Sequence, residues 1–182
     1  MVPCAAKSGT VRFERNATRT GAGDLTGRGV GTGGAAGDTA QSPVTVTHHR
    51  VGYADTDQMG RAHHARYLVW CEVGRTEYMR SRGRSYRSIE ADGILLPVAR
   101  VEIDFRAPLG YDGRVRVETR VLRFRSRMIT FSHGMTVAEG TGEGLLAAVA
   151  RTTVVATDRD GRARTLPDSL REALLTDPRD SA

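Results

Sequence analysis

The hydrophobic and polar positions change their spacing along the chain. Between His64 and Arg82 the large apolar residues recur every three or four positions, the pattern of an amphipathic helix. Gly83 follows directly and is a typical helix stop. A second, short helix is predicted from Ser85 to Ala91. The predicted buried face of the long helix consists of Tyr67, Leu68, Cys71, Gly74, Tyr78 and Met79, and its remaining surface carries Arg66, Glu72, Arg75, Glu77 and Arg80.

In the other apolar segments the hydrophobic residues recur at about every second position, which predicts β-strands. The predicted strands cover residues 43–53, 95–105, 114–124, 128–137 and 145–157, and a short amphipathic helix is expected at 167–175. Polar and Gly-containing turns separate them. The order is one strand, a long helix and then four strands that pair antiparallel. This order predicts an α+β fold in which a curved sheet wraps around the long helix.

Composition sets the limits of the folded domain. The hydrophobic content is 39%, and the deficit is concentrated in residues 1–43, which are rich in Gly, Thr, Ala and Arg. Such a segment buries too little apolar surface to offset its loss of conformational entropy. We therefore predict a disordered leader at 1–43, a single domain at 44–175 and a flexible C-terminus at 176–182.

Charge and cysteine content exclude several classes of protein. The net charge of +6 comes almost entirely from arginines that alternate with acidic residues, without the aromatic-studded basic stripe of a nucleic-acid-binding protein. Cys4 and Cys71 do not form a predicted disulfide, so a reducing, cytoplasmic location is expected. No apolar segment is long enough to cross a bilayer.

Candidate chemistry is concentrated between the first strand and the long helix. The sequence lacks the motifs of serine hydrolases, zinc peptidases and phosphate-binding loops. It does place Asp55, Asp57, His63 and His64 just before or at the start of the helix. The unpaired N–H groups of a helix start can stabilise an oxyanion. A carboxylate beside them could attack a carbonyl or activate water, which suits a thioester substrate.

The residues alone allow two other interpretations of this cluster. Asp55 or Asp57 could be an ordinary helix cap. The four side chains could also bind a metal, although adjacent pairs are unlike the usual ligand spacing.

Several motifs together resemble the 4-hydroxybenzoyl-CoA thioesterase-like branch of the hotdog superfamily, and in particular the acyl-CoA thioesterases associated with the Tol–Pal system. They are YADTDQMG at 53–60, HARYL at 64–68, EVGRTE at 72–77, LPV at 96–98, FRAP at 105–108 and LP at 166–167. The resemblance covers about residues 47–175. It implies a hotdog fold, hydrolysis of acyl-CoA or acyl-carrier-protein thioesters without a cofactor, and a homodimer or homotetramer with active sites at the subunit interface.

The resemblance also implies roles for single residues. Asp57 would be the catalytic carboxylate, as nucleophile or general base, and the backbone N–H of His64 would polarise the thioester carbonyl. Tyr53, Gly60 and Tyr67 would contact the substrate. Arg125 and Arg127, in a turn between strands, are the candidates for the phosphates of coenzyme A.

The sequence departs from the family pattern at three positions that affect substrate choice. Arg61 and His63 replace apolar or aromatic residues, and Arg66 replaces a common Asn. We expect Arg61 and Arg66 to face solvent, with contact to a carrier protein or a phosphate as the alternative. A hotdog enoyl-thioester hydratase or a non-catalytic acyl-binding module are the rival functions.

Overall fold

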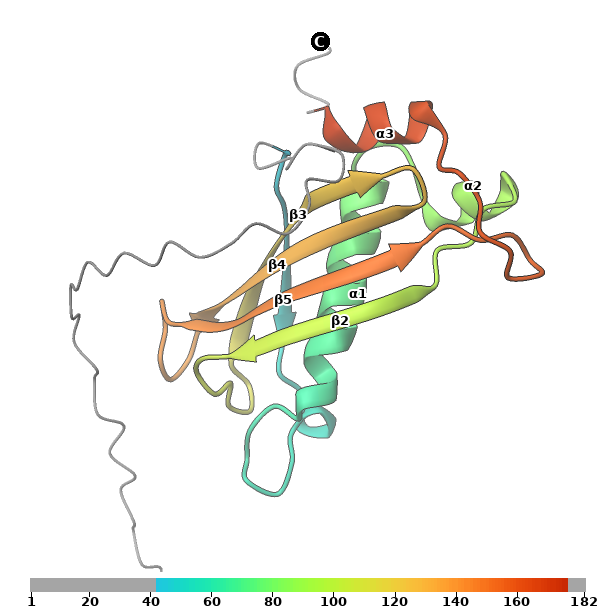
Figure 1. Cartoon of the computed structure of the whole chain (residues 1–182). Helices are drawn as coiled ribbons and strands as arrows, with labels where there is room; N and C mark the ends of the chain where they lie inside the picture. The colour runs from blue at the N-terminus through green and yellow to red at the C-terminus, as the bar shows by residue number, and fades with distance from the viewer. Residues whose placement is uncertain (1–41, 177–182) are drawn as a thin grey trace, which may run out of the picture. The chain divides into compact units, whose positions relative to one another are not determined.

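The computed structural model describes residues 42–176, which all belong to one compact unit of the chain. Three helices and one five-stranded sheet make up this unit (Figure 1). In chain order the elements are β1 (Thr45–Arg50), the short 3-10 helix η1 (Tyr53–Asp55), α1 (His64–Arg80), α2 (Tyr86–Ala91), β2 (Val98–Phe105), β3 (Arg114–Arg125), β4 (Met128–Glu139), β5 (Leu146–Val155) and α3 (Asp168–Leu175). The α+β prediction is confirmed.

The predicted leader and C-terminus lie almost wholly outside the described residues. Of residues 1–43, only the last two are described. Ser42 is buried, and its hydroxyl donates a hydrogen bond to the Val121 carbonyl at 2.7 Å. No helix in the range 42–176 is both long and apolar enough to span a membrane.

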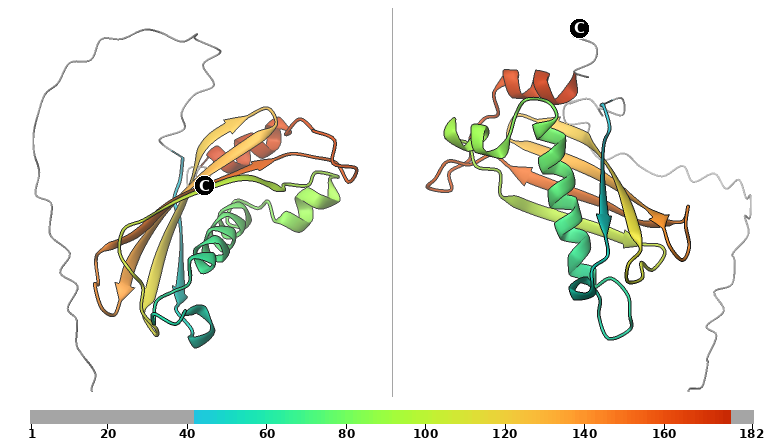
Figure 2. Two further views of the ribbon diagram at one scale, coloured as in Figure 1. Left: turned by 60° about the horizontal axis from the view of Figure 1, so that its bottom comes forward. Right: turned by 180° about the vertical axis from the view of Figure 1, so that it is seen from behind.

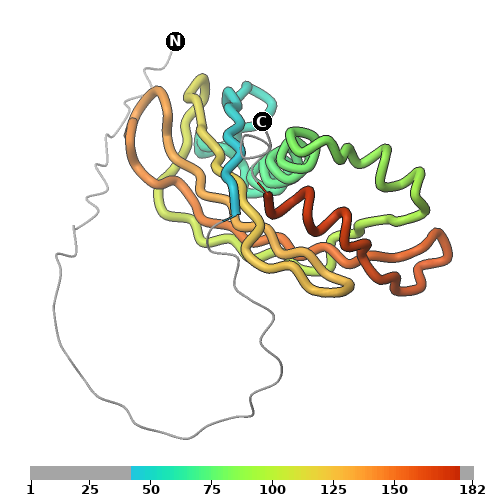
Figure 3. The backbone as a smooth tube through the Cα atoms, turned by 90° about the horizontal axis from the view of Figure 1, so that it is seen from above, coloured from blue at the N-terminus to red at the C-terminus, as the bar shows by residue number. Residues whose placement is uncertain are grey.

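The strand order of the sheet is β1-β3-β4-β5-β2, and every pairing is antiparallel. β2 therefore pairs with β5 rather than with β3, which follows it in sequence. Helices α1 and α2 lie on one side of the curved sheet (Figures 2 and 3). Helix α3 packs on that side too, because its buried leucines, Leu170 and Leu174, join Tyr78 and Phe131 in one core cluster.

Helix α1 approaches the sheet closely at Gly74. A Cβ atom at this position would lie 2.4 Å from the Thr119 hydroxyl of β3, so a larger residue does not fit without movement. The helix ends at Arg80, and the predicted stop residue Gly83 lies in the turn that follows, with a φ of +71° that suits glycine. The N–H groups of Gly83 and Arg84 cap the last turn by binding the Arg80 and Met79 carbonyls at 3.0 Å.

Two predictions about the faces of α1 are wrong. Leu68 was expected in the core but is 43% exposed, whereas Arg75 was expected at the surface but is buried. The buried stripe of the helix runs through Tyr67, Trp70, Cys71, Gly74, Tyr78 and Met79, so it is rotated toward Trp70 and Arg75 and away from Leu68. The first strand is also shorter than predicted, because the chain leaves the sheet after Arg50.

Candidate functional site

Asp57 lies in a tight loop between η1 and α1. Its N–H donates to the Arg61 carbonyl at 2.9 Å, and the Gly60 N–H donates to the Asp57 carbonyl at 2.9 Å. Gly60 has a φ of +68°, which this turn requires and glycine adopts without strain. The loop is closed by a bridge between Thr56 and Ala62. These contacts hold the Asp57 carboxylate on a short, closed loop beside the start of α1.

The two oxygens of the Asp57 carboxylate have different surroundings. Oδ1 accepts a hydrogen bond from the Met59 N–H at 2.8 Å. Oδ2 has no hydrogen-bond partner among residues 42–176. One oxygen therefore orients the group, while the other is available to a substrate or to water.

Helix α1 begins at His64, and His63 is its N-cap. The Nδ1 atom of His63 accepts a hydrogen bond from the Ala65 N–H at 3.3 Å, and its ring lies 4.0 Å from that of His64, centre to centre. Within the described part of the chain, the His64 N–H has no acceptor. This N–H is thus a free donor at the positive end of the helix dipole.

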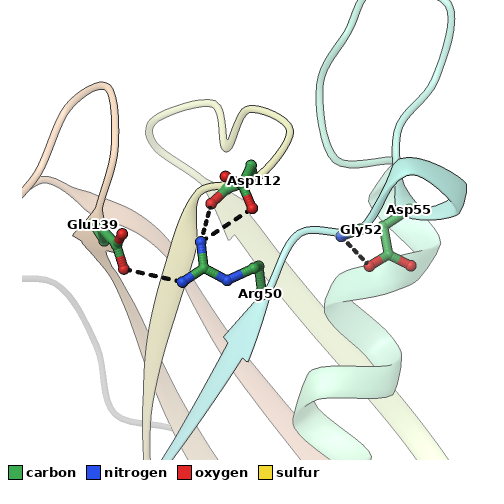
Figure 4. A network of polar contacts seen from close by, with 5 residues as sticks. All are labelled: Arg50, Gly52, Asp55, Asp112 and Glu139. Atoms are coloured by element: carbon green, nitrogen blue, oxygen red, sulfur yellow. Dashed lines mark hydrogen bonds and ion pairs between the residues drawn. The ribbon is translucent and has the colours of Figure 1, made fainter.

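Asp55 connects the loop to the helix rather than facing the site. Its Oδ2 accepts a hydrogen bond from the Gly52 N–H at 2.9 Å (Figure 4), and its carbonyl accepts one from the His63 N–H at 2.8 Å. Its Oδ1 also forms an ion pair with Arg66 Nε at 2.7 Å. Arg66, which was expected to face solvent, is 38% exposed and also pairs with this carboxylate, which is only 14% exposed.

The alternative of a metal site gains no support from this arrangement. The described residues contain no group of three or more His, Cys, Asp or Glu side chains placed to hold a metal ion. Asp55 is directed toward Gly52 and Arg66, and His63 caps the helix. The four polar residues that the sequence places together are thus separated by their orientations.

Asp57 and His64 line one pocket of about 330 Å³. Apolar side chains form most of its wall, and two arginines complete it: the full lining is Asp57, Met59, Arg61, Ala62, His64, Tyr67, Phe105, Arg106, Ala107 and Pro108. The volume lies at the lower end of the range for small-molecule sites. The pocket can accept an acyl group beside the carboxylate.

Tyr67 anchors the wall of this pocket. It is buried, and its ring packs edge-to-face on that of Phe105 at 4.9 Å between centres. The Trp70 ring lies at a tilted angle to it, 5.0 Å away. Burial raises the pKa of the Tyr67 hydroxyl above its ordinary value, so this group stays protonated at neutral pH. Cys71, one turn further along α1, is buried with a thiol pKa raised to about 12, which makes it a core residue rather than a nucleophile.

The other predicted substrate residues are divided between two places. Tyr53 and Gly60 line a second, more polar hollow of about 750 Å³ that Asp57 also lines, where the Tyr53 and Tyr111 rings meet edge-to-face at 6.1 Å. Arg125 and Arg127 lie at the β3–β4 hairpin. Strand β3 begins next to the Asp57 loop and ends at this hairpin, so the structure of one chain does not bring these arginines to the pocket.

Three residues of the pocket wall had no predicted role in the site: Phe105, Arg106 and Pro108. They belong to the FRAP segment at 105–108, which begins at the last residue of β2 and is one of the motifs of the family resemblance. The hydrogen bonds from the Arg106 and Ala107 N–H groups to the Ala147 carbonyl, at 2.8 and 3.1 Å, fix this segment to β5. A signal for these residues was thus present in the sequence.

Comparison with known proteins identifies the family. The profile of the thioesterase-like superfamily matches residues 51–174, so this chain belongs to that superfamily, and its fold is the hotdog fold. It is similar to the putative acyl-CoA thioesterase YneP of Bacillus subtilis, with 46% identity over 76 residues, or 42% of this chain and 55% of that protein. The matched segment therefore spans only about half of that relative.

Two further similarities agree with this assignment. The acyl-CoA thioester hydrolase YbgC of Escherichia coli is 30% identical over 92 residues, which cover 50% of this chain and 69% of that protein. The crystal structure of the hypothetical protein TT1821 from Thermus thermophilus superposes with a TM-score of 0.64 at 34% identity, covering 72% of this chain and 98% of that one. The hotdog architecture predicted from the sequence is confirmed.

Proposed function

We propose that this protein hydrolyses acyl thioesters of coenzyme A or of an acyl carrier protein to a carboxylate and a free thiol. The observation that carries the proposal is that the Asp57 carboxylate and the unpaired His64 N–H line the same pocket. The names of the relatives, acyl-CoA thioesterase and acyl-CoA thioester hydrolase, support this reaction.

The reaction follows from the two groups. The acyl part of the substrate occupies the pocket, and the thioester carbonyl oxygen accepts a hydrogen bond from the His64 N–H. This donor, at the helix N-terminus, stabilises the negative charge that develops on that oxygen. Asp57 either attacks the carbonyl carbon or takes a proton from the water that attacks it. If Asp57 attacks, a C–O bond to its carboxylate forms, the C–S bond breaks, the thiolate leaves and takes up a proton from solvent, and water then hydrolyses the mixed anhydride to the carboxylate. If water attacks, its oxygen forms the C–O bond as Asp57 takes the proton, the C–S bond breaks, and that proton passes to the leaving thiolate.

A single substitution tests the role of Asp57. Asp57→Asn keeps the size of the side chain and removes its charge, so we expect kcat to fall by about a hundredfold or more, the range of a general base. Release of free thiol from a panel of acyl-CoA esters gives the rate, and circular dichroism verifies the fold. The matched control is Asp160→Asn, in an exposed turn between β5 and α3, which should keep wild-type activity.

Two results would contradict this proposal. One is a folded Asp57→Asn variant that hydrolyses acyl-CoA at the wild-type rate. The other is a wild-type protein that hydrates an enoyl-CoA without releasing thiol, which would favour the rival hydratase.

We also propose that the active form contains two copies joined along β2. Among the described residues, no strand pairs with the free edge of β2, and nearly all of its residues are exposed. Val101 and Phe105 alternate with exposed charged residues and share the face of Ile103, which packs against the core. They are 37% and 52% exposed, as expected for a surface that a partner covers.

A two-fold axis suits this edge, because two copies of one strand can pair antiparallel across it. The edge ends at Phe105, which lines the candidate pocket, so a second copy would complete the wall beside the active groups. A role for Arg125 and Arg127 in binding phosphates would also need a second copy. A cytoplasmic location stays a prediction from the cysteine content.

A further inference from the structure

Two arginines lie on the wall of the pocket that holds Asp57. Arg61 belongs to the same short loop as Asp57, and Arg106 directly follows β2. The rest of the wall is mostly apolar. Two arginines thus line a pocket in which Asp57 is the only carboxylate-bearing residue among those that the structure describes.

The position of Arg61 is fixed relative to Asp57. The backbones of the two residues face each other across the loop, with the Asp57 N–H 2.9 Å from the Arg61 carbonyl. A bridge joins Arg61 to Gly110, and its Nη1 atom packs beside Gly110. No carboxylate of the described residues forms an ion pair with Arg61, so its guanidinium is available to a ligand.

Arg106 is anchored at its backbone and only weakly paired at its head. Its N–H donates to the Ala147 carbonyl at 2.8 Å, next to Phe105, which packs against Tyr67. Its partner Asp104 is 3.7 Å away, and both side chains are mostly exposed. Such a pair contributes little and can be exchanged for a better acceptor.

We propose, resting on the thioesterase function above, that this pocket selects short acyl thioesters that carry a second carboxylate at the far end of the acyl group. Guanidinium groups bind carboxylates with paired, charge-assisted hydrogen bonds. The anion comes from the acyl group because the pocket, at about 330 Å³, surrounds the reacting end of the substrate. The long pantetheine arm keeps the phosphates of coenzyme A away from the thioester.

Arg61 contributes a cation to the wall of this pocket. Arg61 is exposed, as the sequence predicts, so its guanidinium is hydrated in the free protein and can exchange water for an anionic partner that enters the pocket. The carboxylate of the substrate supplies that partner.

Matched pairs of substrates test the inference. Glutaryl-CoA and pentanoyl-CoA have the same number of carbons and differ in the terminal carboxylate. We expect the wild type to show a kcat/KM at least tenfold higher for glutaryl-CoA. Arg61→Gln and Arg106→Gln should each remove most of this ratio, chiefly through KM. Arg159→Gln, in an exposed turn, is the control that should leave the ratio unchanged.

The same variants distinguish the source of the anion. N-acetylcysteamine thioesters of the two acids lack phosphates, and the preference for the glutaryl ester should persist with them. If Arg61→Gln lowered kcat/KM equally for both CoA esters and had no effect on the N-acetylcysteamine esters, the arginine would bind a phosphate of coenzyme A, and the inference would be wrong. Equal kcat/KM values of the wild type for both acids would also overturn it.

Binding measurements separate this inference from the proposed reaction. Dethia analogues of glutaryl-CoA and pentanoyl-CoA cannot be hydrolysed, so calorimetric titration reports selection without turnover. Tighter binding of the glutaryl analogue, lost in Arg61→Gln, would support the subsite even if no thioester were hydrolysed. Equal affinities for the two analogues would reject it while leaving the thioesterase function intact.

Discussion

His133 is a fully buried histidine in the middle of the sheet. Its Nδ1 lies 3.0 Å from the Thr119 hydroxyl and its Nε2 lies 2.5 Å from the Thr152 hydroxyl, so both ring nitrogens have partners. Burial, with a smaller contribution from the positive charge of Arg75, lowers its pKa to about 3. The imidazole is therefore neutral in the folded protein and serves as a polar link between β3, β4 and β5.

The low pKa of His133 predicts a specific dependence of stability on pH. The unfolded chain takes up a proton near pH 6.5, whereas the folded chain does so only near pH 3, so stability falls as the pH drops between these values. The maximum slope is about 1.4 kcal/mol per pH unit. Denaturant unfolding of the wild type and of His133→Gln between pH 7 and pH 4 measures it. Other acidic groups affect both proteins equally, and parallel curves would contradict the prediction.

At the scale of elements, Asp55 joins three segments. Its side chain binds Gly52 after β1 and Arg66 in α1, and its carbonyl binds His63 at the start of the helix. The loop that carries Asp57 is thereby held against the helix end that carries the free His64 N–H. A site of this kind requires its groups to be held in the productive geometry by contacts outside the pocket.

Removal of this link should affect both stability and turnover. Asp55→Ala deletes a hydrogen bond and an ion pair of a mostly buried carboxylate, and we expect a loss of about 2 kcal/mol in the free energy of unfolding. Because Asp55 orients the reacting groups without touching the pocket, kcat should fall more than KM rises, and Asp55→Asn should restore part of it. Chemical denaturation and thiol-release kinetics measure the two effects.

A carboxylate at the same end of the molecule provides the control. Asp112 pairs with Arg50 at 3.1 Å, and both side chains are at least half exposed (Figure 4). Asp112 also has a φ of +59°, so Asn, which tolerates this conformation, is the suitable replacement. Asp112→Asn should change stability and kcat very little. An equal loss of kcat in both variants would show that the link at Asp55 has no special role.

The elements themselves were largely predictable because each follows from a local signal. The stop at Gly83 and the alternation in the later strands give bounds within a few residues of those observed. The buried face of α1 was harder to predict. Arg75 carries a charge that is typical of surface residues, yet its guanidinium carbon lies over the Tyr86 ring, 5.1 Å from the ring centre. Tertiary contacts of this kind are not encoded in the spacing of apolar residues.

Part of the pocket wall depends on the topology of the whole sheet, which no local sequence pattern predicts. The position of β2 beside β5 is a property of topology, and it brings Phe105 and Arg106 to the helix start that carries His64. Asp57 and His64 could be paired from the sequence because only six residues separate them. The pocket wall could not be predicted in the same way, because it is assembled across the width of the sheet.

The proposed pairing along β2 is testable with two valines of similar exposure on opposite edge strands. Val101 on β2 is 37% exposed and Val46 on β1 is 39% exposed. Val101→Arg places a charge in the proposed interface, where burial without a partner is costly. Light scattering after size exclusion should find the wild type and Val46→Arg at twice the 19.7 kDa chain mass or a multiple of that, and Val101→Arg at a lower mass.

The thioesterase activity of Val101→Arg should fall as well, because the second copy completes the pocket wall at Phe105. A monomeric wild type, or a Val101→Arg variant of unchanged mass, would show that β2 is not the interface.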